Sequence, residues 1–431
     1  MRGLSTSKLL SILISNFSSL QKKSMGITSE TGQNSTLPQE LIDHILGYMD
    51  TTSLKTVSLA SHAFLYSARR YLFRSILAIN SRCGRSVVAL QDCIVHSPWT
   101  MHSHRIRCLD ISGVTPFPAL IFVMSALSGL HTLDIYDAKI IDIPDPLPSP
   151  PISTRPMKTL SLHNVSSRSI LGSIVPPSQI EFYLLHVFSC VSNVSISRGL
   201  SSRDEEGKTR WRFPIPCPPK TKITSFSLGW VIYNNAATIR SHAAMLLQSL
   251  DMASVTSLTM PVWPPDCAIE YGPLYHAASH TLSHLALAIS RSAFSNRGES
   301  QQSDPQCWSQ LRLSSCHTLR TVELIFGNNN EQALAQVWRH LIDILSTISA
   351  FSLSKITFNL YTSCLPEATT DGFPWDALES TLLKCCSGTA QVAFVAPNWC
   401  GIRANFQSTI HQMLPQVEQR CVVSFKCFYR T

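Results

Sequence analysis

A six-residue unit recurs through most of the chain and is the feature that most restricts its fold. Each copy reads apolar-x-x-apolar-x-apolar, and its last two apolar positions alternate as the residues of a short β-strand do. Nine copies occur, starting 24 to 37 residues apart: IRCLDI at Ile106, LHTLDI at Leu130, MKTLSL at Met157, VSNVSI at Val191, ITSFSL at Ile223, VTSLTM at Val255, LSHLAL at Leu282, LRTVEL at Leu319 and LSKITF at Leu353. The unit predicts a series of short strands, each with one apolar face.

Several segments between these units have a helical pattern. The clearest are AATIRSHAAMLLQSLDMA before Val255 and NNEQALAQVWRHLIDILSTISA before Leu353, where apolar residues recur at helical spacing. Strand, turn and helix repeated at this period are typical of leucine-rich repeats, whose units stack with their strands along one curved face. Ordinary α/β structure with similar strands is the alternative, because no copy continues into the full motif with its Asn or Cys ladder.

The repeats are interrupted by Pro-rich and polar insertions: IPDPLPSPPISTRP, WRFPIPCPPKT and SNRGESQQSDPQCW. Near the C-terminus, FPWDALESTLLKCC predicts a helix, TAQVAFVA a strand, and LPQVEQRCVVSFKCF a closing cap, which a repeat array needs because its ends expose apolar edges. We therefore predict an α/β fold class. Residues 81–431 are expected to form an irregular leucine-rich-repeat-like solenoid with a curved, mostly parallel sheet.

From Thr36 to Ile79 the pattern is helical throughout. The apolar positions of LPQELIDHILGYMD are Leu41, Ile45 and Leu46, with Ile42 and Met49 beside them. The stretch from Asp50 to Ser53 supplies a break and an N-cap for a second helix, and a third helical stretch includes Phe64. Three short helices form only a thin core by themselves.

This stretch resembles the F-box, a three-helix module. The resemblance is carried by Leu37-Pro38 with Glu40-Leu41, by Ile45-Leu46, by Ser53-Leu54 with Val57 to Ala60, and by ARRYLFRSI from Ala68. The chain is most similar to F-box proteins of mushroom-forming fungi, in which such openings precede degenerate leucine-rich repeats. In that family a Trp commonly stands where this chain has Phe64.

The resemblance implies an F-box at residues 34–80, after an extension at 1–33 that we expect to be disordered. It also implies docking on the Skp-type adaptor of a cullin ligase complex. The adaptor-binding residues would be Leu37, Pro38, Leu41, Ile45, Leu46, Leu54, Val57, Leu59, Ala60 and Phe64. A thin helical unit cannot bury all its apolar surface internally, which suits an adaptor. The alternative is that these side chains pack only against the repeat domain.

The sequence contains no common catalytic motif. It has no GxSxG elbow, no GxxxxGK[ST] loop and no HExxH helix, so we expect no enzyme activity and no cofactor. His102 and His104 are the best candidate metal pair, but they have no nearby Cys or acidic partner, and we expect no metal. Asp110 and Asp134 occupy matching positions in successive units, where solvation or partner contact is a commoner role than catalysis.

Charge, cysteines and apolar runs limit the partners. The net charge of +8 arises from scattered Lys and Arg without a dense basic run, so no nucleic acid is expected. The 14 cysteines are spread through the chain, as in Cys108 of a strand-like segment, which favours a reducing compartment. The longest apolar run, PALIFVMSAL, is too short to cross a bilayer, so we expect no membrane partner. A cytoplasmic or nuclear location follows.

We therefore predict a substrate-recognition subunit of a cullin-type ubiquitin ligase that binds the adaptor through its F-box and an unknown protein substrate through its repeats. One alternative is a leucine-rich-repeat scaffold or ligand-binding protein with no ligase role. Another is an organellar or secreted repeat protein led by the N-terminal extension, which is basic, Ser-rich and free of acids until Glu30.

Overall fold

The computed structural model describes most of the chain after residue 37. The described residues are 38–60, 62–72, 74–79, 85–96, 106–144, 147–150, 153–170, 175, 177–198, 218–231, 236–262, 265–289, 311, 313–326, 334–349, 352–360, 373–397 and 403–428. Leu37, the extension at 1–33, the pair His102 and His104, and the insertion at 295–308 lie outside them.

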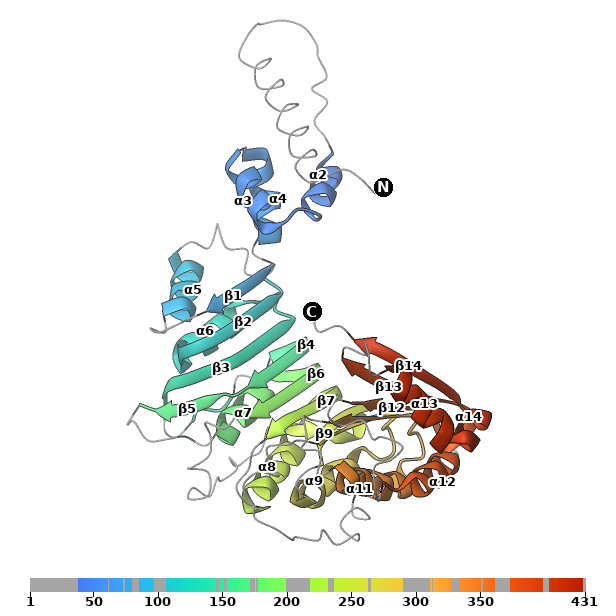
Figure 1. Cartoon of the computed structure of the whole chain (residues 1–431). Helices are drawn as coiled ribbons and strands as arrows, with labels where there is room; N and C mark the ends of the chain where they lie inside the picture. The colour runs from blue at the N-terminus through green and yellow to red at the C-terminus, as the bar shows by residue number, and fades with distance from the viewer. Residues whose placement is uncertain are drawn as a thin grey trace, which may run out of the picture.

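One open sheet of 14 strands organises the described residues (Figure 1). The strands are β1 (Ser75–Ile79), β2 (Cys108–Pro116), β3 (Thr132–Ile143), β4 (Ser153–His163), β5 (Ser166–Ser169), β6 (Phe188–Arg198), β7 (Thr221–Val231), β8 (Leu250–Asp251), β9 (Ser257–Pro261), β10 (His284–Ile289), β11 (Thr321–Phe326), β12 (Leu353–Asn359), β13 (Cys386–Pro397) and β14 (Val422–Phe428). They pair in the order β1-β2-β3-β4-β6-β7-β9-β10-β11-β12-β13-β14, with β5 on β3 and β8 on β7. These pairings are parallel, and most strands pair with the next one along the chain, except that β4 pairs with β6 and β7 also pairs with β9.

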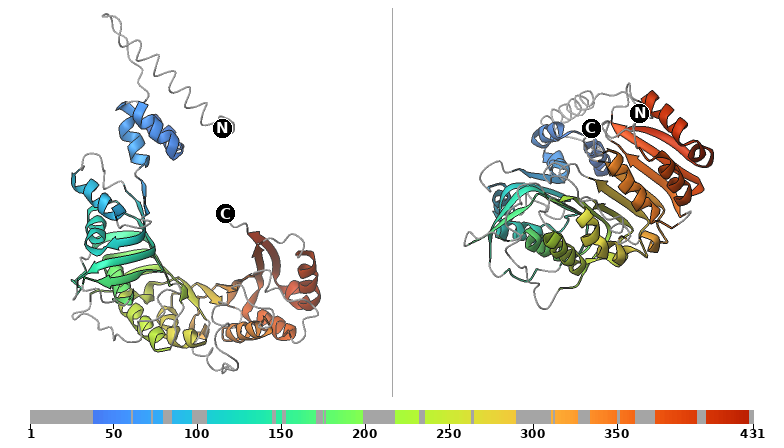
Figure 2. Two further views of the ribbon diagram at one scale, coloured as in Figure 1. Left: turned by 60° about the vertical axis from the view of Figure 1, so that its left-hand side comes forward. Right: turned by 60° about the horizontal axis from the view of Figure 1, so that its bottom comes forward.

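Helices connect the strands and form the second layer of this α/β fold. They are α2 (Gln39–Leu46), α3 (Thr51–Ala60), α4 (His62–Leu72), α5 (Arg85–His96), α6 (Phe117–Ala126), α7 (Pro177–His186), α8 (Ala236–Ser249), α9 (Pro265–Ala278), α11 (Leu334–Ser346), α12 (Trp375–Cys385), α13 (Arg403–Met413) and α14 (Pro415–Arg420), with short 3-10 turns at Met252–Ser254 and Leu313–Ser315. Figure 2 shows the helices from α5 onward along the outer side of a curved sheet, while α2 to α4 form a separate group before β1.

The apolar positions of the recurring unit align across the sheet. The fourth position of each unit pairs with its equivalent on the next strand, giving the row Ile76, Leu109, Leu133, Leu160, Val194, Phe226, Leu258, Leu285, Val322, Ile356, Val392 and Val423. In all nine units the three apolar side chains are at most 7% exposed. The predicted apolar strand face is therefore confirmed, and it joins the helices in one continuous core.

Most predicted elements are confirmed where they are described. α8, α11 and α12 fall in the expected helical segments, and β13 includes TAQVAFVA. The prediction of helix as far as Ile79 was wrong, because the helices end at Leu72 and Ser75–Ile79 forms β1. Ser75–Ile79 is a short apolar run whose preference for a helix is weak. Parallel pairing with β2 outweighs that preference, so the segment forms a strand.

Three equivalent positions have a left-handed backbone. Gly113, Asp137 and Asn164 each follow a ladder residue by four positions, with φ values of 76°, 47° and 52°. Gly, Asp and Asn tolerate this region best. The pairing of β2 with β3 shifts register here, and the Asn164 Nδ2 donates a hydrogen bond to the Asp137 Oδ1 at 2.7 Å. The first three units thus share a left-handed position that the six-residue unit alone does not reveal.

Gly229 is required by the close approach of two strands. A Cβ at this position would lie 2.7 Å from the Cβ of Ser197 on the neighbouring strand. We expect Gly229→Ala to lower the free energy of unfolding by roughly 1–3 kcal/mol, as overpacking does. Thermal or urea unfolding of the full chain measures this. Gly388→Ala is the matched control, because nothing lies within 4 Å of its added Cβ and its effect should be neutral or slightly stabilising. Equal loss of stability in both variants would contradict the steric argument.

Candidate protein-binding surface

Helices α2, α3 and α4 form a small unit with its own apolar core. The core side chains are Ile42, Leu46, Leu54, Val57, Phe64 and Ala68, with Met49, Tyr71 and Leu72 packed against them. This cluster is distinct from the core beneath the large sheet, which begins at Val87 among the described residues. The unit therefore gains its internal packing independently of the sheet.

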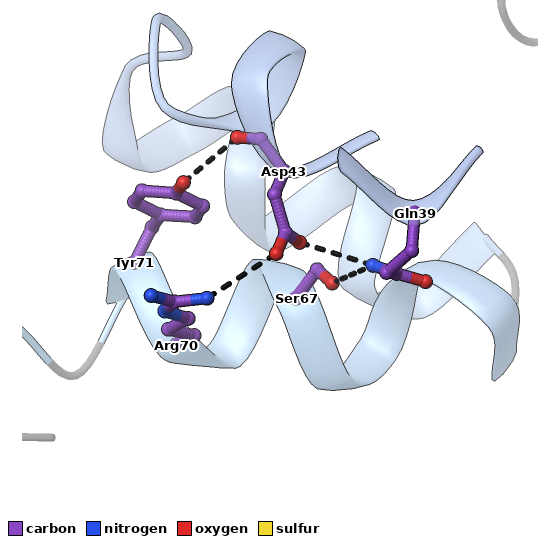
Figure 3. Close-up of polar contacts among 5 residues, drawn as sticks. All are labelled: Gln39, Asp43, Ser67, Arg70 and Tyr71. Carbon is purple, nitrogen blue, oxygen red and sulfur yellow. Dashed lines mark hydrogen bonds and ion pairs between the residues drawn. The ribbon is translucent and has the colours of Figure 1, made fainter. Parts of the chain in front are cut away.

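Polar contacts of Asp43 join α2 to α4 (Figure 3). The Asp43 carboxylate accepts hydrogen bonds from the Gln39 Nε2 at 3.0 Å and from the Arg70 Nη1 at 3.2 Å. The Tyr71 hydroxyl donates to the Asp43 backbone carbonyl at 2.8 Å, and the Gln39 Nε2 also donates to the Ser67 Oγ at 2.6 Å. These contacts fix the rotation of α2, and so decide which of its side chains face outward.

Asp50 caps the start of α3. Its Oδ1 accepts hydrogen bonds from the backbone N–H groups of Thr52 and Ser53, both at 2.9 Å, and its Oδ2 accepts one from the Ser53 hydroxyl at 2.8 Å. The hydrogen bonds from Ser53 are the main reason that the pKa of Asp50 lies below its ordinary value. The N-cap expected between Asp50 and Ser53 is therefore Asp50 itself.

The structure divides the ten predicted adaptor-binding residues into groups. Pro38, Leu41, Leu59 and Ala60 are exposed, and Ile45 is half-buried. Leu46, Leu54, Val57 and Phe64 are buried in the core of the helical unit, and Leu37 lies outside the described residues. The exposed group can contact a partner directly, whereas the buried group can only support that surface.

The apolar face expected for α2 is rotated in the structure. Ile42 and Leu46 are the buried pair at i and i+4, while Leu41 is 47% exposed. The sequence pattern placed Leu41 with the core because both rows have helical spacing, and the Asp43 contacts select between them. Leu59 is 88% exposed and Tyr48 is 75% exposed, and both are large apolar side chains on this unit. The sequence analysis did not identify Tyr48 as a candidate binding residue. Its position at the end of the first helical segment, between Gly47 and Met49, gave no indication that its side chain would be exposed.

A buried trio of titratable side chains links three helices under the sheet. The His242 Nε2 lies 3.2 Å from the Glu181 Oε2, and the His242 Nδ1 lies 3.0 Å from the Tyr271 hydroxyl. The side chains of His242 and Glu181 are 1% and 3% exposed. A substrate could not reach groups buried to this degree, so the trio serves to join α7, α8 and α9.

The predicted match between Asp110 and Asp134 is confirmed as a direct pairing of adjacent strands. Burial is the main reason that the pKa of Asp110 is raised above its ordinary value, and the charge of Asp134 adds to it. Both carboxylates lie on the sheet face opposite the apolar ladder, so the pair is a charged feature of the uncovered face.

The described residues include free cysteines, most of which are buried or half-buried. Eight cysteines of the described residues are free thiols, and burial raises the pKa of Cys316 and of Cys385 to about 11. Such thiols stay protonated and are weak nucleophiles at neutral pH. No group of three His, Cys, Asp or Glu side chains in the described ranges could hold a metal ion. No helix in the same ranges is long and apolar enough to span a membrane.

Comparisons with known proteins assign no family. No protein-family model matches the chain, and a search of curated proteins finds no significant match.

The rotation of α2 can be tested with two adjacent substitutions. Ile42→Ala should destabilise the helical unit by roughly 2–5 kcal/mol, because it opens a cavity in the core. Leu41→Ala is the control and should cost less than about 0.5 kcal/mol, as exposed substitutions usually do. Hydrogen exchange of peptides from residues 39–72 would report the difference as faster exchange in the first variant. Faster exchange in Leu41→Ala than in Ile42→Ala would contradict the observed rotation.

The carboxylate pair predicts a pH-dependent effect. Because the folded state raises the pKa of Asp110, ionisation of this group costs stability as the pH rises through that pKa. Asp110→Asn should therefore increase the free energy of unfolding at pH 7 by on the order of 1 kcal/mol, which a higher melting temperature would report. This increase should shrink as the pH falls towards the ordinary pKa of Asp. Asp134→Asn removes only the neighbouring charge, which is the weaker cause of the raised Asp110 pKa, and should therefore increase the free energy of unfolding by less. A lower melting temperature for Asp110→Asn at neutral pH would refute this account.

Proposed function

We propose that the chain is a substrate-recognition subunit of a cullin-type ubiquitin ligase, an F-box protein. The observation that carries the proposal is the helical unit, which leaves Leu41 and Leu59 exposed although it has its own packed core. Large exposed apolar side chains on a small unit are typical of a protein-binding surface. They are among the residues that the resemblance assigns to the adaptor contact.

The fold after the helices supports the second half of the proposal. The parallel strands, paired largely in sequence order with helices on the outer side, support the proposal of a leucine-rich-repeat-like solenoid, whose units stack side by side. Such an array presents a wide sheet face to a protein substrate. In this role the chain performs no bond chemistry, and it increases the effective concentration of substrate lysines near a recruited conjugating enzyme.

A scaffold or ligand-binding protein without a ligase role is the second candidate. Its support is that the helical unit and the sheet have separate cores, so that the sheet does not need the helices for its internal packing. Phe64 also differs from the Trp common in F-box sequences and is 7% exposed, inside the unit. Adaptor binding separates the two candidates.

Co-purification with a Skp-type adaptor tests the proposal. The wild-type chain should bind the adaptor, and Leu41→Asp combined with Leu59→Asp should weaken binding at least about tenfold, because two charges would replace apolar contacts. Val95→Asp combined with Val422→Asp is the matched control, since Val95 and Val422 are 50% and 60% exposed on elements outside the helical unit. Failure of the wild-type chain to bind any Skp-type adaptor, or equal binding by both double variants, would favour the scaffold.

A further inference from the structure

We propose that a row of basic side chains at the start of the sheet binds an acidic segment of a partner protein. The row consists of Arg74, Arg107, His131 and Lys158, here called the basic row. All four side chains are exposed. The proposal is independent of adaptor binding by the helices.

The four residues occupy equivalent positions before successive strands. Each precedes a ladder residue by two positions, and those ladder residues, Ile76, Leu109, Leu133 and Leu160, are paired across β1, β2, β3 and β4. Backbone hydrogen bonds also join the row directly. The N–H of Arg107 donates to the carbonyl of Arg74 at 2.9 Å, that of His131 to Arg107 at 2.8 Å, and that of Lys158 to His131 at 2.8 Å.

The spacing of the row is set by the sheet. Adjacent strands lie about 4.8 Å apart, so the row extends roughly 14 Å across the strand starts. Arg74 and Arg107 are direct neighbours, and placing like charges this close is unfavourable in the free protein. None of the four forms an ion pair with a carboxylate among the ion pairs of the described residues. An anionic partner would relieve the repulsion and supply the missing counter-charges.

The acidic pair Asp110 and Asp134 lies farther along the strands than the basic row does. Asp110 and Asp134 follow Arg107 and His131 by three residues, which is about 10 Å along a strand. The basic row therefore lies at the strand starts, next to the turn that follows α4. The Arg74 N–H donates to the Tyr71 carbonyl of that helix at 3.3 Å. An acidic segment bound to the row would thus lie beside the helical unit.

The neighbouring side chains favour a protein segment over a single-stranded nucleic acid. Nucleic-acid grooves combine cations with aromatic side chains that stack on the bases. The residues that directly follow the row on β2, β3 and β4 are Cys108, Thr132 and Thr159, which are small and paired in register. The threonine hydroxyls can donate hydrogen bonds to carboxylates. None of these three side chains has a ring that could stack on a base, and the one ring in the row itself is the imidazole of His131. Asp and Glu side chains on an extended segment fit this surface.

Fluorescence anisotropy of the full chain with a labelled peptide of alternating Glu and Ser tests the proposal. Arg107→Gln combined with Lys158→Gln should weaken binding about tenfold at low salt and flatten the salt dependence. The matched control is Arg320→Gln with Lys355→Gln, which removes the same charge from the C-terminal half of the sheet and should change affinity less than about twofold. A peptide of alternating Gln and Ser should not bind.

A charge reversal keeps the test decisive if the neutral variant folds poorly. Lys158→Glu changes one exposed side chain, and it should weaken binding of the Glu-Ser peptide while gaining binding of a Lys-Ser peptide. No binding by the wild-type chain, or equal loss in the two neutral double variants, would overturn the proposal. Tighter binding of oligothymidylate than of the Glu-Ser peptide would also overturn it, in favour of a nucleic acid.

Discussion

Residue-for-residue alignment of apolar side chains across a parallel sheet is the constraint on which the rest of the structure depends. An inner ladder residue such as Leu133 lies between its equivalents Leu109 and Leu160 and is fully buried under the helices. A shift of one residue in any strand would turn this face towards solvent and bury polar side chains in its place. The ladder therefore fixes the register of every other position along the strands, including those that carry charge.

The helical unit is organised by a different interaction. Its apolar core is small, and both Leu41 and Ile42 belong to helical rows that could face inward. The contacts of Asp43 with Arg70 and Tyr71 on α4 select the rotation that buries Ile42 and leaves Leu41 outside. A few polar contacts thus decide which apolar side chains remain available to a partner, and the proposed adaptor surface depends on them.

The polar groups inside the molecule are placed to join elements. Glu181, His242 and Tyr271 connect three successive helices from within the core, and the described thiols with raised pKa values stay protonated. The surface carries the features suited to recognition: exposed apolar side chains on α2 and α3, and aligned charges on the sheet. This distribution fits a protein that acts by binding, as proposed.

The sequence by itself determined the strands, several of the helices and the apolar strand face, because a period of two within a unit and a repeat of the unit along the chain are local properties. It could not place Ser75–Ile79, whose strand conformation depends on pairing with β2. Nor could the sequence predict that Arg107 and Lys158 lie in one row, since they are 51 residues apart in the chain. Only the tertiary structure aligned them, because parallel pairing places equivalent positions of successive strands about 4.8 Å apart, which leaves Arg107 and Lys158 roughly 10 Å apart across β3.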